Sequence, residues 1–171
     1  MLHIYHGDGK GKTTAAMGLA LRMIGTGNKV FIVQFLKGRP SGEIQSLLKM
    51  DRVTVLRGRP DTKFTFQMSA AEMDSVRELH NRQLQLAFSA AAQGSADLIV
   101  LDEALDAIAT GTLEEGMLLE LILQNKEKTE IVLTGRNLSA QVLAAADYVT
   151  QMKKEKHPYD LGMQARKGIE Y

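Results

Sequence analysis

MLHIYHGDGKGKTT, residues 1–14, is the stretch that decides the fold of this chain. Its opening residues, Met1 to Tyr5, form an apolar run of strand length, which leads into a glycine-rich turn ending in Lys-Thr and then into a helical pattern. A strand, a turn of this composition and a helix in this order present backbone N–H groups and one lysine to a polyphosphate. The segment therefore predicts a binding site for a nucleoside triphosphate.

The residue types of the turn suit that role. Its glycines can adopt positive φ and lack a Cβ, so the loop can curl with its N–H groups converging on phosphate oxygens; they are Gly7, Gly9 and Gly11. Lys12 supplies a positive charge for the phosphates, and the hydroxyl of Thr13 is placed to hold Mg²⁺. A glycine-rich turn that binds nothing is disfavoured, because the glycines, the Lys-Thr pair and the strand-helix context coincide.

The loop departs from the common phosphate-binding pattern in its length. The common pattern would place a glycine at position 6, where this chain has His6. The first glycine here is Gly7, so the loop is one residue shorter. We expect this loop to seat phosphates differently from the loop of an ordinary ATPase.

Composition limits the classes of protein to which the chain can belong. A length of 171 residues fits a single domain, 1–171, with a charged tail at 152–171. The 21 Lys and Arg residues nearly balance the 20 Asp and Glu residues, so bulk charge favours neither nucleic acid nor an anionic membrane as a partner. The absence of cysteine excludes disulfides and thiolate metal sites. Because the sequence shows no leader and no apolar run that would span a bilayer, we expect a cytoplasmic protein.

Apolar runs of strand length alternate with helical patterns along the whole chain. Strands are predicted near residues 2–6, 30–35, 53–56, 97–102, 130–134 and 147–151. This alternation predicts an α/β fold with three layers, a mostly parallel sheet of the P-loop NTPase (RecA-like) type with helices on both faces. Helices are predicted over 13–25, from a capping box of Ser69 and Glu72 to about residue 94, and from a second capping box of Thr112 and Glu115.

Two segments rich in Gly, Pro, Arg and Lys follow strand ends and are predicted as loops: 36–43 and 57–68. They would lie at the carboxyl edge of the sheet, where open α/β folds bind ligands. Phe64 and Phe66 stand two apart in the second loop, flanked by Arg57, Arg59 and Lys63. In a strand-like segment both rings would point the same way and offer an aromatic surface to a flat apolar ligand. A loop that tucks both rings into the core is the open alternative.

Carboxylates follow another predicted strand, in ADLIVLDE at residues 96–103. Asp102 or Glu103 would face the phosphate loop and complete the shell of Mg²⁺ directly or through water. The four histidines, His3, His6, His80 and His157, have no metal-ligand spacing, so no zinc site is predicted; His80 is expected to be solvated or to serve as a cap.

The stretch IVLTGRN, residues 131–137, places a polar turn after the next strand. Thr134, Arg136 and Asn137 would contact the nucleotide or a second substrate. Alternatively, the stretch is an ordinary strand-to-helix turn with Ser139 as the N-cap. The sequence leaves both interpretations open.

Six segments together resemble a known family. They are GDGKGKTT, VQFLKG (33–38), LIVLDE, VLTGRN, AADYVT (145–150) and KHPYDLGMQARKGIEY (156–171). In this order they resemble the ATP:corrinoid adenosyltransferases that act on cob(I)alamin and cobyrinic acid a,c-diamide. The resemblance covers nearly the whole chain, and its C-terminal segment is more specific than the phosphate loop.

This resemblance implies a reaction. The 5′-deoxyadenosyl group of ATP would pass to the Co(I) of a corrinoid, with Co(I) attacking C5′ and inorganic triphosphate leaving. ATP would lie reversed along the loop, with Asp8 toward the ribose. The triphosphate would be neutralised by Mg²⁺ (or Mn²⁺) together with Lys10, Lys12, Thr13 and Thr14.

The family also packs a Phe-Thr-Trp motif against the lower face of the corrin, which displaces the axial ligand and makes Co(II) easier to reduce. The matching residues are Phe64, Thr65 and Phe66, so that phenylalanine replaces tryptophan. The resemblance further implies a homodimer and a flavoprotein reductant. Many relatives carry a segment before the first strand; here the sequence opens on the strand, so cover for the site would come from the loops or the tail, or be absent.

Two other functions remain open from the sequence alone. A general P-loop ATPase or nucleoside kinase would use the same phosphate loop but would release ADP. A corrinoid or nucleotide carrier would bind without turnover.

Overall fold

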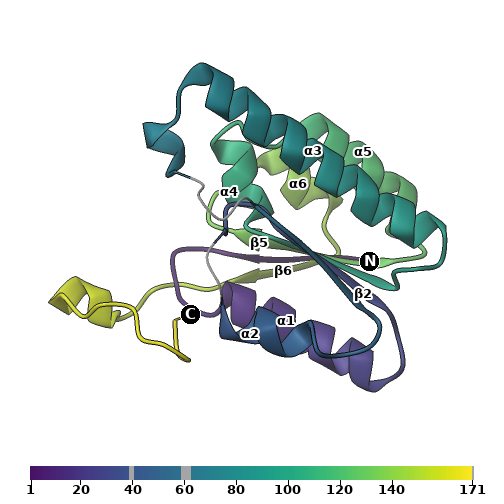
Figure 1. Ribbon diagram of the computed structural model, residues 1–171, viewed down its shortest axis with the longest axis horizontal. Helices are drawn as coiled ribbons and strands as arrows, with labels where there is room; N and C mark the ends of the chain where they lie inside the picture. Colours follow the sequence, from purple (N-terminus) through teal and green to yellow (C-terminus); the bar gives the residue numbers. More distant parts are fainter. Residues whose placement is uncertain (39–40, 59–62, 171) are drawn as a thin grey trace.

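A single sheet of six parallel strands forms the centre of the molecule (Figure 1). The computed structural model describes residues 1–38, 41–58 and 63–170, and the six strands belong to this part of the chain. They are β1 (Leu2–His6), β2 (Val30–Gln34), β3 (Val53–Arg57), β4 (Leu98–Asp102), β5 (Glu130–Gly135) and β6 (Tyr148–Gln151). Their order is β3-β2-β4-β5-β1-β6, and every pairing is parallel. All six predicted strands are therefore confirmed.

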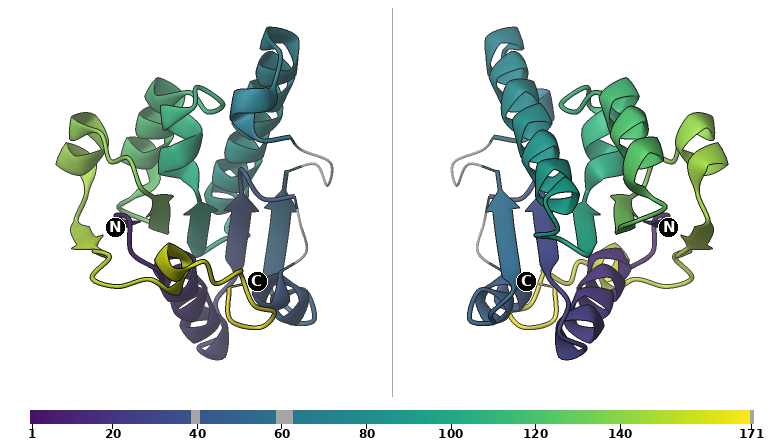
Figure 2. Two further views of the ribbon diagram at one scale, coloured as in Figure 1. Left: turned by 90° about the vertical axis from the view of Figure 1, so that its left-hand side faces the viewer. Right: turned by 90° about the vertical axis from the view of Figure 1, so that its right-hand side faces the viewer.

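Helices cover both faces of the sheet and make three layers (Figures 1 and 2). α1 (Lys12–Gly25) and α2 (Gly42–Leu47) lie on one face. The other face carries α3 (Ala70–Ala92), α4 (Ala104–Ala109), α5 (Glu115–Asn125) and α6 (Ala140–Ala145). Two short 3-10 turns, η1 (Thr65–Gln67) and η2 (Pro158–Leu161), lie outside these layers. Among the helices that the structure describes, none combines the length and apolar character needed to cross a bilayer.

Two apolar cores form because the central strands bury both of their faces. In β2, Phe31 and Val33 belong to the core under α3 and α5, whereas Val30 and Ile32 belong to the core over α1. A strand that is covered on both sides needs apolar residues at consecutive positions. This requirement explains why the sequence of the central strands shows continuous apolar runs.

One of the two predicted capping boxes is confirmed. Ser69 caps α3 through a reciprocal capping box, in which its hydroxyl accepts the N–H of Glu72 at 3.3 Å and its own N–H donates to Glu72 Oε2 at 2.8 Å. The second capping box is wrong: the N-cap of α5 is Glu114, and the hydroxyl of Thr112 donates to the carbonyl oxygen of Ala107 at 3.2 Å. Thr112 is fully buried beside the end of α4, where its hydroxyl also lies 3.2 Å from the hydroxyl of Thr110.

His80 also differs from expectation. It is 1% exposed, and its Nδ1 lies 3.0 Å from the carbonyl oxygen of Thr112. Burial lowers the pKa of the ring below its ordinary value. The prediction of a solvated His80 is therefore wrong, and the residue serves as a polar link between α3 and the α4–α5 connection.

The carboxyl ends of the strands meet at one edge, where the loops and the tail gather (Figure 2). The predicted loop 36–43 includes the start of α2, and Arg39 and Pro40 lie outside the described residues. In the loop 57–68, Arg57 ends β3 and Thr65–Gln67 forms η1, while 59–62, Arg59 among them, lie outside the described part. Tyr171, the last residue of the tail, also lies outside it.

Candidate active site

The phosphate-binding loop connects β1 to α1 and is already bonded to the rest of the protein. The N–H of Gly7 donates to the carbonyl oxygen of Gly135 at 3.2 Å, and that of Gly9 donates to the carbonyl oxygen of Met152 at 2.7 Å. α1 begins after Gly11 at φ 115°, and among the described residues no side chain caps it. The N–H groups of its first turn are therefore the donors that remain for an anion.

The C-terminal segment explains why two of the loop positions are glycine. A Cβ at Gly9 would lie 2.7 Å from the carbonyl oxygen and 2.8 Å from the carbonyl carbon of Met152. At Gly7, where φ is +113°, a Cβ would come still closer to the same oxygen. The backbone after β6 therefore packs directly on the loop, which the sequence argument, directed at phosphates alone, did not anticipate.

Asp102 lies at the centre of a buried polar cluster at the end of β4. Its side chain is fully buried. Among the described residues it accepts hydrogen bonds from the hydroxyls of Thr13 (2.8 Å) and Thr134 (2.7 Å), the amide of Gln34 (3.0 Å) and the ammonium of Lys37 (2.8 Å). The structure thus brings the predicted Asp102 and Thr13 together, and it adds Lys37 and Gln34 from the end of β2.

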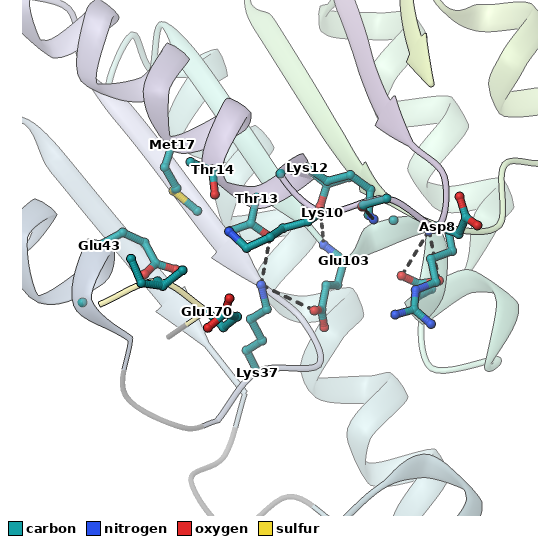
Figure 3. A pocket seen from close by; sticks show the side chains of 18 of the residues that line it. Asp8, Lys10, Lys12, Thr13, Thr14, Met17, Lys37, Glu43, Glu103 and Glu170 are labelled. Carbon is teal, nitrogen blue, oxygen red and sulfur yellow. Dashed lines mark hydrogen bonds and ion pairs between the residues drawn. The ribbon is translucent and has the colours of Figure 1, made fainter. Parts of the chain in front are cut away.

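Lys37 and Glu103 complete this cluster (Figure 3). The ammonium of Lys37 donates to Thr13 Oγ1 at 3.0 Å and lies 3.4 Å from Glu103 Oε1. Burial opposes the charge of Lys37, but the carboxylates of Asp102 and Glu103 outweigh it, so the pKa of Lys37 lies above its ordinary value. Burial raises the pKa of Glu103 in turn. Glu103 adopts φ 61°, and its N–H donates to the hydroxyl of Thr134 at 2.9 Å.

The side chain of Lys12 folds back over the phosphate loop that precedes it. Its ammonium donates to the carbonyl oxygen of Gly9 at 2.7 Å and lines the same pocket as Lys10 and Thr14 (Figure 3). Burial, with Arg136 nearby, lowers the pKa of Lys12. The predicted cationic residues of the loop therefore border one space.

Asp8 faces the tail. Its carboxylate accepts the N–H of Lys154 at 3.0 Å, and this bond holds the pKa of Asp8 below its ordinary value. Asp8 also lines the pocket, so it connects the phosphate loop to the segment that follows β6.

The turn after β5 is held by Asp106, which the sequence argument missed. The carboxylate of Asp106 accepts the backbone N–H of Arg136 at 3.1 and 3.2 Å and the side-chain amide of Asn137 at 3.3 Å. Arg136 lines the pocket, whereas Asn137 is outside the described lining residues. Ser139 caps α6 by accepting the N–H of Val142 at 3.2 Å, so the turn performs the capping role as well.

These elements enclose a pocket of about 680 Å³, within the usual size of ligand sites. The phosphate loop, α1, Lys37, α2 and the turns after β4 and β5 supply most of its lining. The tail contributes the remainder, which consists of His157, Gly168, Ile169 and Glu170. Arg166 pairs with Glu170 at 3.0 Å and lowers the pKa of Glu170 to about 2, so this carboxylate is ionised beside the pocket.

The oxygens around Lys37 suit a hard divalent cation. Mg²⁺ prefers oxygen ligands and keeps several waters, so it is usually bound through one or two carboxylates plus substrate phosphates. Thr13, Asp102 and Glu103 supply such oxygens, and the ammonium of Lys37 shows that a cation is favourable among them. Across the described residues, no group of three His, Cys, Asp or Glu side chains is close enough to hold a metal alone. The donor set therefore fits a metal that arrives with a triphosphate.

Phe64 and Phe66 form a stacked pair on the surface. Their ring centroids are 5.4 Å apart with planes 11° from parallel, and the residues are 64% and 81% exposed. The rings are therefore not tucked into the core, and the segment is a 3-10 turn rather than strand-like. η1 and the tail project on the same side of the molecule (Figure 1). Neither ring belongs to the described lining of the pocket.

Comparisons with known proteins find a matching family and several named relatives. The whole chain, residues 1–171, matches the family described as ATP:corrinoid adenosyltransferase BtuR/CobO/CobP. It is 34% identical to a corrinoid adenosyltransferase of Escherichia coli strain K12, over 98% of this chain and 84% of that protein. It is 33% identical to a corrinoid adenosyltransferase of Pseudomonas aeruginosa, over 100% of this chain and 83% of that protein.

The fold is also similar to that of a solved ATPase. The structure of EssC (ATPases 2 and 3) from Geobacillus thermodenitrificans superposes with a TM-score of 0.52 at 10% identity, over 98% of this chain and 34% of that one. At this identity the similarity establishes the fold alone. It agrees with the P-loop NTPase-like sheet described above.

Proposed function

The chain belongs to the ATP:corrinoid adenosyltransferase family BtuR/CobO/CobP and is an alkyl-group transferase, and from that premise we propose that it transfers the 5′-deoxyadenosyl group of ATP to Co(I) of a corrinoid. The structural observation that supports the proposal is a pocket of about 680 Å³, which is bordered by both the phosphate loop and the specific C-terminal tail. A site for a triphosphate thus lies beside the segment that distinguishes this family from other P-loop proteins.

The reaction forms one bond and breaks one. The electron pair of Co(I) forms the bond to C5′ of the ribose, and the electrons of the C5′–O5′ bond leave with inorganic triphosphate. No water has to be positioned at the γ-phosphate, since the bond broken is between carbon and oxygen. The protein must instead stabilise a leaving polyanion and align C5′ with cobalt.

The chain's own residues supply that stabilisation. Lys12 and Lys10 bring positive charge to the triphosphate, and the N–H groups at the start of α1 add hydrogen bonds, Thr14 among them. Thr13, Asp102 and Glu103 would hold Mg²⁺, which neutralises part of the triphosphate charge when bound. Asp8 and Arg136 border the pocket and are proposed to face the nucleotide.

Phe64 and Phe66 are proposed to meet the lower face of the corrin. Support comes from their exposed parallel rings, which have no role in either apolar core. An apolar face against the corrin would keep water and an axial ligand away from cobalt, which favours reduction of Co(II). A flavoprotein reductant and a homodimer complete the proposal and derive from the family resemblance. A cytoplasmic location is proposed as well, as expected from the sequence.

A single anaerobic assay tests the function. The protein is mixed with ATP, Mg²⁺ and a chemically reduced corrinoid, and the absorption of a light-sensitive Co–C bond is followed while nucleotide products are separated by chromatography. We expect adenosylcorrinoid and triphosphate in equal amounts. Formation of ADP would instead identify an ATPase or kinase, and binding without any Co–C product would identify a carrier. Running several corrinoids in parallel identifies the preferred substrate.

A further inference from the structure

Lys37 occupies the position in which a divalent cation is proposed to sit. It lies on the segment that follows β2 and points at the phosphate loop (Figure 3). Its ammonium is 2.8 Å from Asp102 Oδ2, 3.0 Å from Thr13 Oγ1 and 3.4 Å from Glu103 Oε1. These are the three side chains assigned above to the metal.

The burial of Asp102 explains why a cation belongs there. The side chain is fully buried, and a buried carboxylate without a counter-charge is strongly unfavourable. Its other donors, the hydroxyls of Thr13 and Thr134 and the amide of Gln34, are neutral. Lys37 therefore supplies the positive charge in this set of donors, at 2.8 Å from Asp102 Oδ2.

A metal ion bound directly to these oxygens would compete with Lys37 for them. A Mg²⁺ ion binds its oxygens at about 2.0–2.1 Å, which would place it among the same atoms that the ammonium contacts, with like charges repelling. Lys37 has a route away from the cluster, because 29% of its side chain is exposed and it lines the pocket. Oxygens of a triphosphate in that pocket would give the displaced ammonium new acceptors.

We propose that the ammonium of Lys37 occupies the metal site in the nucleotide-free protein and leaves it only when a divalent cation arrives with the triphosphate. Lys37 is then a positioning residue. It prevents free metal ions from binding to Asp102 and Glu103, and it moves to the phosphates when the metal enters. This inference rests on the proposed function for the identity of the triphosphate. Its consequence is that metal binding depends on ATP.

The test measures binding of Mn²⁺ alone to the nucleotide-free protein, using the electron paramagnetic resonance signal of free Mn²⁺. Lys37→Met should bind Mn²⁺ about tenfold more tightly than wild type, or better, because the competing charge is gone. Lys49→Met, at an exposed position outside the pocket, makes the same change in net charge and should behave as wild type. Lys37→Met/Asp102→Asn should lose the gain. If Lys37→Met does not fold, as judged by circular dichroism, Lys37→Gln carries the same expectation.

The same titration with ATP, in which protein-bound Mn²⁺ is counted by equilibrium dialysis because ATP itself chelates Mn²⁺, separates this inference from the proposed function. In wild type, ATP should tighten Mn²⁺ binding strongly, and in Lys37→Met the tightening should be about tenfold smaller. Lys37→Arg, which keeps the charge, should bind Mn²⁺ alone as weakly as wild type. Normal Mn²⁺–ATP binding with no gain in the neutral variants would overturn the role of Lys37 and leave the function standing. Wild-type protein that binds ATP equally with and without Mn²⁺ would overturn the metal site, and this inference with it.

Discussion

The two sides of the proposed site are built in opposite ways. On the phosphate side, Asp102 is 0% exposed and is bonded to donors from α1, β2 and β5. On the aromatic side, Phe64 and Phe66 are 64% and 81% exposed and lie in a turn of three residues. One side is assembled before any ligand arrives, and the other presents apolar surface to solvent.

This difference fits the two proposed substrates. A triphosphate is a compact polyanion, and donors that are already oriented stabilise its departure without reorganisation. A corrin is a broad flat ring, and exposed aromatic faces gain free energy when such a surface covers them. Substitutions on the phosphate side should therefore affect every assay, whereas those on the aromatic side should depend on the oxidation state of cobalt.

Lys12→Ala should have the largest effect and tests the phosphate side. The substitution removes the charge that is proposed to face the triphosphate, and we expect kcat/KM and ATP affinity to fall by about 100-fold. Measurement combines steady-state adenosylation with equilibrium binding of ATP. Lys49→Ala, at an exposed position outside the pocket, is the matched control and should change neither. Retained kcat/KM in Lys12→Ala would contradict the loop assignment.

Gly9→Ala tests whether the tail is part of the phosphate side. Its Cβ would lie 2.7 Å from the carbonyl oxygen of Met152, a clash with backbone that cannot move cheaply. Overpacking of this kind costs about 1–3 kcal/mol, which corresponds to a fall in Tm of about 2–12 °C for a chain of this length. Thermal unfolding by circular dichroism measures it.

Gly18→Ala is the control for that experiment. Gly18 lies in α1, and a Cβ there would meet no heavy atom of the described residues within 4 Å. Alanine should stabilise the helix by about 0.5–1 kcal/mol. Equal Tm values for Gly9→Ala and wild type would show that Met152 does not pack against the loop in solution.

Phe64→Ala should have a smaller and more selective effect. Because the ring is exposed, its loss should leave Tm nearly unchanged, while adenosylation that starts from Co(II) should slow by about tenfold. The rate from pre-reduced Co(I) should change by less than about twofold. Leu123→Ala, an exposed apolar residue on α5, is the control for loss of apolar surface. Equal losses from Co(II) and Co(I) would rule out a role of the ring in reduction.

The fold was predictable because its signals are local. Parallel strands buried on both faces require continuous apolar runs, and the runs of β2 and β4 are readable without any knowledge of their neighbours. The positions of Asp102 and Thr13 followed from the same logic, since the carboxyl ends of parallel strands meet at one edge. Capping was less predictable: Thr112 and Glu115 have the right spacing, but the hydroxyl of Thr112 bonds to a carbonyl oxygen near the end of the preceding helix, α4.

The parts of the site that were missed depend on contacts distant in sequence. Lys37 lies in a segment that was predicted as a loop at the carboxyl edge of the sheet, but nothing in its neighbours indicates a bond to Asp102. Asp106 appears in the sequence as an ordinary helical residue, yet it holds the turn at Arg136. Gly9 is typical of a phosphate loop, and the structure shows a second requirement for glycine at this position, which is the close approach of the Met152 backbone. Such pairings are set by the whole fold.

Phe66→Trp should have the smallest effect, and it enlarges the aromatic surface instead of removing it. The family pattern that this chain resembles has tryptophan at this position, and Phe66 is 81% exposed, so a larger ring has room beside the stacked ring of Phe64. A wider aromatic face should raise the rate from Co(II) by about twofold to threefold, with no change from Co(I) and none in Tm. Stopped-flow reduction with a flavoprotein donor measures it. Because the phosphate side is preassembled, gains of this kind should be confined to the exposed side; a parallel gain from Co(I) would mean that the ring acts on alkyl transfer itself.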